Sequence, residues 1–207
     1  MEAITITSLP IMLFDERKLT PSFGYVFNPK WLDPHESIVS ILWKLMRMNR
    51  LSGHMVTTQL AKTKVIDPYH GIAASRSELD IRKLHQALGV SLKILRGSLP
   101  DAVRSRSSPY LRYCRKCMLR GYHGVIHQLE SVTTCPVHGT MLEVECIRCG
   151  ACTPYRLNAY LLDAYYRCAQ CRKLYASSLP DIAYKPALNK KARIAITRSR
   201  LNHCWYF

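Results

Sequence analysis

Four short pairs of cysteine and histidine residues are the part of this sequence best suited to chemistry. In each pair two residues separate the two ligands, so that a tight turn can direct both side chains at one metal ion. The first two pairs are Cys114 with Cys117 and Cys135 with His138; the next two are Cys146 with Cys149 and Cys168 with Cys171. Four such ligands complete a tetrahedral zinc shell with no open position. The spacing therefore predicts two structural zinc ions as cofactors, one for each set of four ligands.

Two histidines between the first ligand pairs suggest a second kind of metal chemistry. His123 and His127 are four residues apart, with Glu130 nearby. Their order, HGVIH, lacks the glutamate that follows the first histidine in zinc proteases, and the zinc-deaminase pattern is also missing. Saturated zinc sites leave no position for a substrate. We therefore expect a binding module with no catalytic residue, and a metal-dependent hydrolase that uses the two histidines is the remote alternative.

The charge balance of the sequence is strongly basic. The 207 residues include 30 Lys and Arg against 14 Asp and Glu, which gives a formal net charge of +16. Such an excess predicts a polyanionic partner, DNA or RNA. A solvated basic surface without a nucleic-acid partner is the alternative. We predict nucleic-acid contacts for Arg82, Lys93, Arg96, Arg104 and Arg106.

The sequence pattern predicts neither secretion nor membrane contact. No apolar run approaches the roughly 18 residues that cross a bilayer. The first residues also lack a basic segment followed by a long apolar stretch. We therefore expect a cytoplasmic protein. Because disulfides are rare in that reducing compartment, seven of the nine cysteines are expected to bind metal. Cys152 and Cys204 are left over; Cys152 could compete as a ligand, but we expect it to pack.

Helical patterns dominate the region before the metal ligands. Asp33 is expected to cap a first helix, Ser52 a second and Ser77 a third. Gly89 is expected to end the third helix and Ser91 to begin a fourth. The last two helices, in ELDIRKLHQALGVSLKILRG, fit a helix-turn-helix whose second helix could enter a major groove. Simple packing of two short helices within an all-α domain is the alternative.

These patterns divide the chain into four parts. We predict an N-terminal arm at 1–31, a helical domain at 32–100, a tandem zinc-binding domain at 110–176 and a basic tail at 177–207. The tail is expected either to be disordered or to become ordered on DNA or a partner. The predicted fold class is α-rich with small zinc-binding modules: a helix-turn-helix-like domain followed by a tandem zinc knuckle or ribbon domain.

Aromatic residues are concentrated in the N-terminal arm, at Phe23, Tyr25, Phe27 and Trp31. Aromatic side chains often act as the anchors of protein–protein interfaces. We therefore predict that these four residues contact a partner. Packing of the same rings on the chain's own helical domain is the alternative.

Three segments carry longer motifs. LDPHESIVSILWKLMRMNRLS begins with Pro-x-Glu-Ser and ends with Asn-x-Leu-Ser. YLRYCRKCMLRGYHGVIHQLESVTTCPVHGTMLEVECIRCG combines a Leu-Arg-Tyr-Cys lead with Tyr-His, His-Gln-Leu and Cys-Pro-x-His-Gly, and YYRCAQCRKLYA carries the last ligand pair. Together these segments resemble the TniQ/TnsD family of transposition target-selection proteins, over residues 32–176. The middle segment is the most specific of the three.

The resemblance implies a bacterial transposition factor. Members of this family select a target and recruit an AAA+ ATPase, which in turn brings the transposase. Some members bind a fixed DNA site through a longer C-terminal region, whereas short members work beside an RNA-guided CRISPR complex. Because the sequence continues only briefly beyond Cys171, we expect the short adaptor kind. Its expected partners are the ATPase, a CRISPR effector complex with its DNA or RNA, and a second copy of the chain in a homodimer.

A stand-alone zinc-dependent DNA-binding protein is the alternative within the binding class. It would be a transcription regulator or an autonomous site-specific targeting factor. Such a protein would bind a defined duplex tightly and without partners, whereas the adaptor needs several modest contacts that act together.

Overall fold

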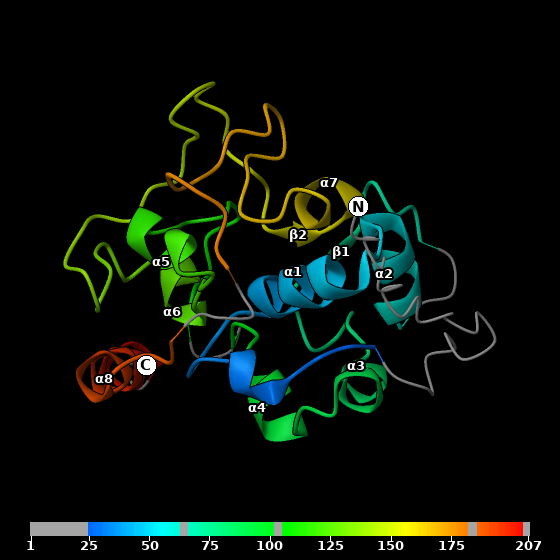
Figure 1. Ribbon diagram of the computed structural model, residues 1–207, viewed down its shortest axis with the longest axis horizontal. Helices are drawn as coiled ribbons and strands as arrows, with labels where there is room; N and C mark the ends of the chain where they lie inside the picture. The colour runs from blue at the N-terminus through cyan, green and yellow to red at the C-terminus, as the bar shows by residue number, and fades with distance from the viewer. Residues whose placement is uncertain (1–24, 63–65, 102–104, 182–185, 205–207) are drawn as a thin grey trace, which may run out of the picture.

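A computed structural model describes residues 25–62, 66–101, 105–181 and 186–204 of the chain. This part is rich in helix and contains one small sheet (Figure 1). Two of the predicted contact residues, Phe23 and Arg104, lie outside it. The helical elements are η2 Pro29–Trp31, α1 Ile38–Asn49, α2 Gly53–Leu60, α3 Ile81–Leu88, α4 Leu92–Gly97, α5 Arg115–Leu119, α6 Val125–Gln128, α7 Ala159–Leu162 and α8 Lys190–Cys204. The strands β1 Ile72–Ala73 and β2 Arg156–Leu157 pair antiparallel.

Helix α1 runs through the middle of the molecule, with α7 on one side and α3 and α4 on the other (Figure 1). Every residue from Ile38 to Met46 is buried, as expected for a helix that is packed on all sides. The N-cap is Ser37, whose hydroxyl accepts from the Ser40 amide, so the predicted cap at Asp33 is wrong. The Asp33 carboxylate instead accepts from the amide of Leu188, far along the chain.

Helices α2, α3 and α4 form a compact group whose ends are set by local capping. Ser52 caps α2 and Ser91 caps α4, as predicted. Asp80 caps α3 by accepting from two backbone amides, so the predicted start at Ser77 is wrong. Gly89 ends α3 in the left-handed conformation, with φ 63°, as the sequence indicated. The two helices then pack on one another.

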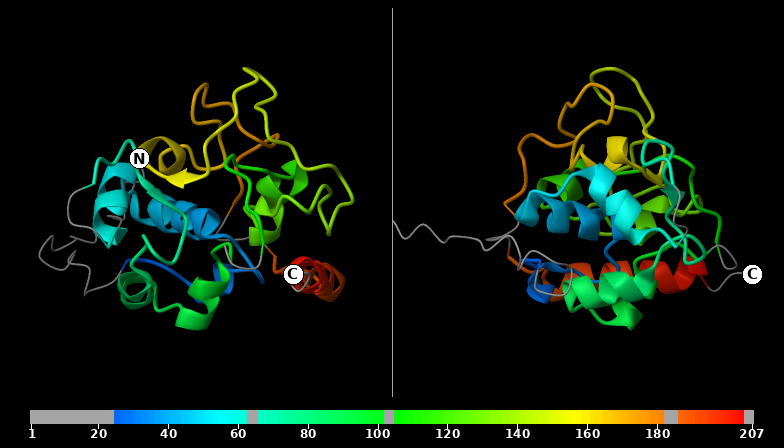
Figure 2. Two further views of the ribbon diagram at one scale, coloured as in Figure 1. Left: turned by 180° about the vertical axis from the view of Figure 1, so that it is seen from behind. Right: turned by 90° about the vertical axis from the view of Figure 1, so that its right-hand side faces the viewer.

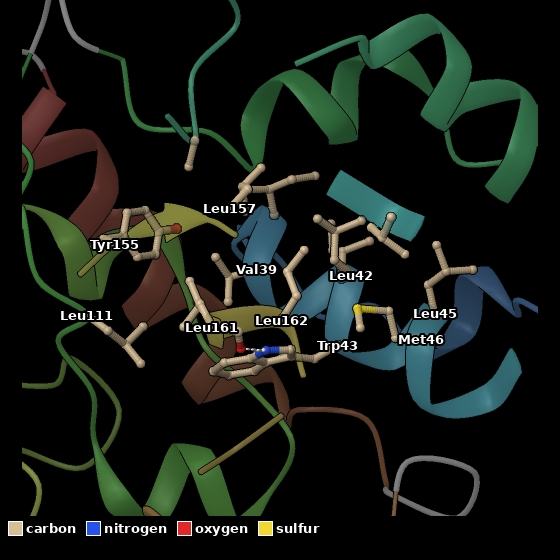
Figure 3. Close-up of a cluster of buried hydrophobic side chains, with 14 of the residues drawn as sticks. Val39, Leu42, Trp43, Leu45, Met46, Leu111, Tyr155, Leu157, Leu161 and Leu162 are labelled. Atoms are coloured by element: carbon tan, nitrogen blue, oxygen red, sulfur yellow. Dashed lines mark hydrogen bonds between the residues drawn. The ribbon is translucent and has the colours of Figure 1, made fainter. Parts of the chain in front are cut away.

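The larger core cluster draws residues from both the predicted helical domain at 32–100 and the predicted zinc-binding domain at 110–176. Trp43 of α1 lies in its centre, with its indole N–H donating to the Leu161 carbonyl at 2.9 Å (Figure 3). Its ring packs on Tyr166, with the ring centroids 4.9 Å apart. The sheet joins the same two regions, because Ile72 pairs with Leu157. The predicted domain limits remain predictions, but the regions that they separate share this core.

A second, smaller core cluster lies beside α5 and α6 and includes the C-terminal helix. Leu188 and, from α8, Ala192 and Ile196 pack there with Tyr122 and Ile126. The left view in Figure 2 shows α8 at the edge of the molecule. The sequence left disorder open for this region, whereas the structure gives a helix over Lys190–Cys204. Within the described residues, no helix has the length and apolar character needed to cross a membrane.

Candidate metal centres

The first set of predicted ligands comes together in one cluster. The Nδ1 atom of His138 lies 3.4 Å from the sulfur of Cys114, 3.3 Å from that of Cys117 and 3.5 Å from that of Cys135. The Cys117 and Cys135 sulfurs are 3.6 Å apart. Cys114 is the N-cap residue of α5 and Cys117 lies within that helix, while the other two ligands lie in the turns that follow α6. Ligands more than twenty positions apart in the chain thus enclose one point.

The second set forms a similar cluster in the part of the molecule drawn at the top of Figure 1. The Cys146 and Cys171 sulfurs are 3.6 Å apart, and those of Cys149 and Cys168 are 3.7 Å apart. Cys146 and Cys168 are buried, whereas Cys149 is exposed. Cys152, which was predicted to pack, is exposed, so that prediction is wrong; it is also not part of the cluster.

Both clusters fit a tetrahedrally coordinated ion. Zinc–sulfur bonds of about 2.3 Å place two sulfurs of a tetrahedral site about 3.8 Å apart. The sulfur–sulfur distances of 3.6–3.7 Å match that edge length closely. Three of the four residues in the first cluster are buried. Both clusters are therefore suited to hold a metal ion. The prediction that these eight residues form two four-ligand clusters is confirmed.

Three of the four ligand pairs are built on the same small hairpin. In each one, the first cysteine donates its amide to a carbonyl five residues on: Cys135 to Thr140, Cys146 to Ala151 and Cys168 to Lys173. Its own carbonyl accepts from the residue four positions on, which is Gly139, Gly150 or Arg172. These three residues all have positive φ, between 59° and 69°. The repeat explains the spacing, since the turn brings both ligands of a pair to one side.

Hydrogen bonds also prepare the first cluster for a metal ion. Side-chain hydrogen bonds from Cys117 and Cys135 hold the pKa of Cys114 far below its ordinary value. A thiolate is the form of cysteine that binds metal. The same contacts raise the pKa of Cys117, so its proton is released as a metal ion binds.

The two histidines considered for catalysis are buried and serve structural roles. His123 donates from Nε2 to the Arg112 carbonyl at 2.8 Å and accepts at Nδ1 from the Ser37 hydroxyl at 2.6 Å. Burial lowers its pKa to about 4. His127 accepts at Nδ1 from the Gly124 amide, and burial together with the neighbouring His123 lowers its pKa to about 3. Both rings are therefore neutral at physiological pH, and His123 has no free nitrogen for a substrate or a metal.

The contact between His123 and Ser37 is part of a junction between the start of α1 and the segment that precedes α6. The Ser37 amide donates to the His123 carbonyl at 2.7 Å, in addition to the side-chain contact. The Tyr122 hydroxyl donates to the Pro34 carbonyl at 3.0 Å, and Glu36 forms an isolated bridge with Gly124. The Pro-x-Glu-Ser segment and the Tyr-His segment, which the sequence places far apart, are thus joined side by side.

Glu36 also forms a buried ion pair with Lys44, whose side chain is completely buried. The Lys44 ammonium donates to the Trp31 carbonyl at 2.8 Å, and the Glu36 carboxylate accepts from the Ser40 hydroxyl at 2.6 Å. It also accepts from the Asp33 amide. A buried charge pair needs such additional bonds to offset its desolvation. The sequence pattern of an apolar helical stripe gave no sign of this pair.

The predicted nucleic-acid residues do not form one surface. Arg82 and Arg96 are exposed and line the same cleft. Lys93, also exposed, lines a different cleft beside α8, and Arg106 is exposed in the loop that follows residues 102–104. The structure therefore separates Lys93 from Arg96, although both lie on α4.

The described arm aromatics pack on the chain's own core. Tyr25, Phe27 and Trp31 are partly buried against the larger cluster. The rings of Phe27 and Trp31 meet edge to face, with centroids 5.6 Å apart. This packing is the alternative that the sequence left open, and a partner contact through these residues stays a prediction.

Comparison of the chain with protein-family models found no match, and a search of curated proteins found none either.

Proposed function

We propose that this chain is a target-selection adaptor of DNA transposition, similar to the short members of the TniQ/TnsD family. In this role it links a target-DNA complex or an RNA-guided CRISPR complex to an AAA+ ATPase, and so to the transposase. Its setting would be the bacterial cytoplasm. The two metal clusters would each hold a structural zinc ion in a knuckle-like or ribbon-like module, and α3 with α4 would act as a helix-turn-helix.

The junction between Ser37 and His123 is the observation that carries this proposal. Both residues belong to the motifs on which the family resemblance depends, yet 86 positions separate them. A chance likeness of two segments would not require them to meet. Their contact supports the interpretation that the two motifs form one structural unit, as expected if both come from the same family.

The distribution of rigid elements also favours an adaptor. Each metal cluster fixes two hairpin or helix ends in place without a large core, because a structural metal site supplies folding free energy itself. The loops that carry the second metal cluster project from the body of the molecule (Figure 1). A rigid platform with projecting loops and a basic surface suits a protein that binds two partners at the same time.

Recruitment of the ATPase tests the proposal. The metal-loaded protein is immobilised, and binding of the AAA+ ATPase encoded in the same transposon is measured with and without target DNA. We expect saturable binding that DNA strengthens. A protein that binds one defined duplex tightly and ignores the ATPase would contradict the adaptor and support the stand-alone DNA-binding alternative.

The arm residues allow a sharper version of this experiment. Val26 is 53% exposed, whereas the neighbouring Phe27 packs on the core. If the arm contacts the ATPase, Val26→Asp weakens recruitment with the melting temperature unchanged. The control is Met141→Asp, because Met141 is also apolar and exposed, at 73%, and lies in the loop between the two metal clusters. Equal recruitment by both variants would remove the arm from the interface.

A further inference from the structure

A cleft of about 470 Å³ lies where the end of α2, the loop before α3, and helices α3 and α4 meet. Four positive side chains line it: Lys62, Arg76, Arg82 and Arg96. All four residues are exposed, and they come from four separate segments of the chain. Leu79, Ile81 and Leu92 supply the apolar part of the lining. The fold therefore gathers at one place charges that the sequence scatters over thirty-five positions.

Contacts among these segments hold the cations at one edge without neutralising them. The Lys62 ammonium donates to the Arg76 carbonyl at 2.6 Å, and the Arg76 guanidinium donates to the Arg96 carbonyl at 3.3 Å. Within the described residues, no carboxylate forms an ion pair with any of the four. Backbone carbonyls orient the first two side chains but carry no net charge, so the positive charge of the cleft remains available.

The acidic side chains nearest in sequence are occupied elsewhere. Asp80 also lines the cleft, but its carboxylate accepts from the backbone amides of Arg82 and Lys83 as the cap of α3. The Glu78 carboxylate accepts from the amide of Ala73. The lining thus carries four positive charges against one negative charge.

We propose that this cleft binds the phosphodiester backbone of a nucleic acid. Arginine presents a planar fork of N–H donors that fits phosphate oxygens in a bidentate manner, and lysine adds a compact charge. Contacts of this kind position a protein on nucleic acid but do not read its sequence. The inference rests on the proposed function for the presence of a nucleic acid, and it assigns the groups that hold it. Lys62 and Arg76, which the sequence did not single out, belong to this site.

Salt dependence of binding provides the test. A short fluorescent DNA duplex is titrated with the full-length, zinc-loaded protein at several salt concentrations. Two double variants, R82Q/R96Q and K62Q/R76Q, each remove two charges from the cleft. The matched control K190Q/K191Q removes two exposed charges from α8. Each cleft variant is expected to lower the slope of log affinity against log salt by about two, and the control by less than one.

The comparison between variants decides the outcome. If the slope of log affinity against log salt falls equally in the cleft variants and in the α8 control, net charge alone holds the DNA. That result would overturn the proposal. Absence of duplex binding by the wild type at low salt would do the same. Melting temperature and zinc content of every variant establish that it is folded. The side chains of Arg82 and Arg96 make no hydrogen bond within the described residues. R82Q/R96Q therefore removes charge without breaking a structural contact, unlike K62Q/R76Q.

Further probes identify the source of the phosphates and separate this proposal from the adaptor function. Similar slope losses with an RNA duplex would support recognition of the backbone alone, and losses with DNA alone would restrict the site to DNA. Displacement of the duplex by polyglutamate at equal charge concentration would overturn the proposal in favour of an acidic protein surface. ATPase recruitment is measured on the same variants without DNA. Its failure in the wild type would reject the adaptor but leave the cleft result standing.

Discussion

Removal of one ligand from the first metal cluster is expected to unfold one part of the protein and spare another. Cys117 is buried in the smaller core cluster, together with Ile126 and, from α8, Ala192 and Ile196. Cys152 is exposed and outside both metal clusters. The substitutions Cys117→Ser and Cys152→Ser change the same atom, so they form a matched pair.

The expected magnitude follows from the small size of that core. A structural zinc site contributes on the order of 10 kcal/mol to folding. Whole domains are stable by only about 5–15 kcal/mol. The cluster around Cys117 contains three metal ligands among its eleven buried residues, so little apolar packing remains once the metal is lost. We therefore expect α5, α6 and α8 to lose their fixed structure in Cys117→Ser.

The larger core should survive this substitution. Trp43 lies in that core and contacts Leu161 and Tyr166, none of which belongs to the first metal cluster. Because the chain has three tryptophans, the measurement uses the background Trp31→Phe/Trp205→Phe. The fluorescence of Trp43 should stay that of a buried indole, while limited proteolysis cuts within residues 186–204. Metal analysis should fall from two zinc ions per chain to one.

Cys152→Ser serves as the control and should keep both ions, with an unchanged melting temperature. The reasoning is refuted if Cys117→Ser retains two zinc ions and resists the protease as the control does. Simultaneous loss of Trp43 burial would also contradict it, because it would show that the two cores unfold as one unit.

Three further predictions concern single residues outside the ligand sets. The pKa of His123 is lowered by burial to about 4, so the unfolded chain takes up a proton first as pH falls; stability should drop by about 3 kcal/mol between pH 6.5 and pH 4. Denaturant titrations, with zinc content checked at each pH, should show a weaker pH dependence for His123→Gln, and equal dependence would exclude this histidine as the cause. Lys44→Met leaves Glu36 buried without its partner and should cost about 3–5 kcal/mol in urea unfolding, with partial recovery in the double variant Lys44→Met/Glu36→Gln; no recovery would argue against the ion pair. Gly150→Ala places a methyl group at φ 69°, where no atom lies within 4 Å. It should lower the free energy of unfolding by about 1 kcal/mol, as Gly89→Ala should. Loss of zinc from Gly150→Ala would contradict a purely conformational effect.

The metal clusters were predictable because their information is local. Two ligands of a pair lie within four positions, and the hairpin that joins Cys146 to Gly150 needs no distant contact. The caps of α2 and α4 at Ser52 and Ser91 were predictable for the same reason. Each depends on a side chain that bonds to the backbone three positions away.

The errors arose where tertiary contacts replaced a local bond. Asp33 fits the local pattern of a cap, but its carboxylate accepts from Leu188, and Ser37 caps α1 instead. Helix α8 was not predicted, since its buried side chains, among them Ala192 and Ile196, form only a narrow stripe in a basic segment. These side chains are buried because they pack on apolar residues beside the first metal cluster, among them Tyr122 and Ile126.

The sequence by itself determined which residues could bind metal, how they pair, and that the protein is basic and rich in helix, because ligand chemistry, turn spacing and charge are properties of neighbouring residues. Only the tertiary structure decided that His123 is a neutral structural residue bonded to Ser37, 86 positions away. It also decided that Arg76 and Arg96 share a cleft while Lys93 faces another. These outcomes depend on which segments become neighbours in space, and that choice is made by burial of the whole core and not by any short stretch of the chain.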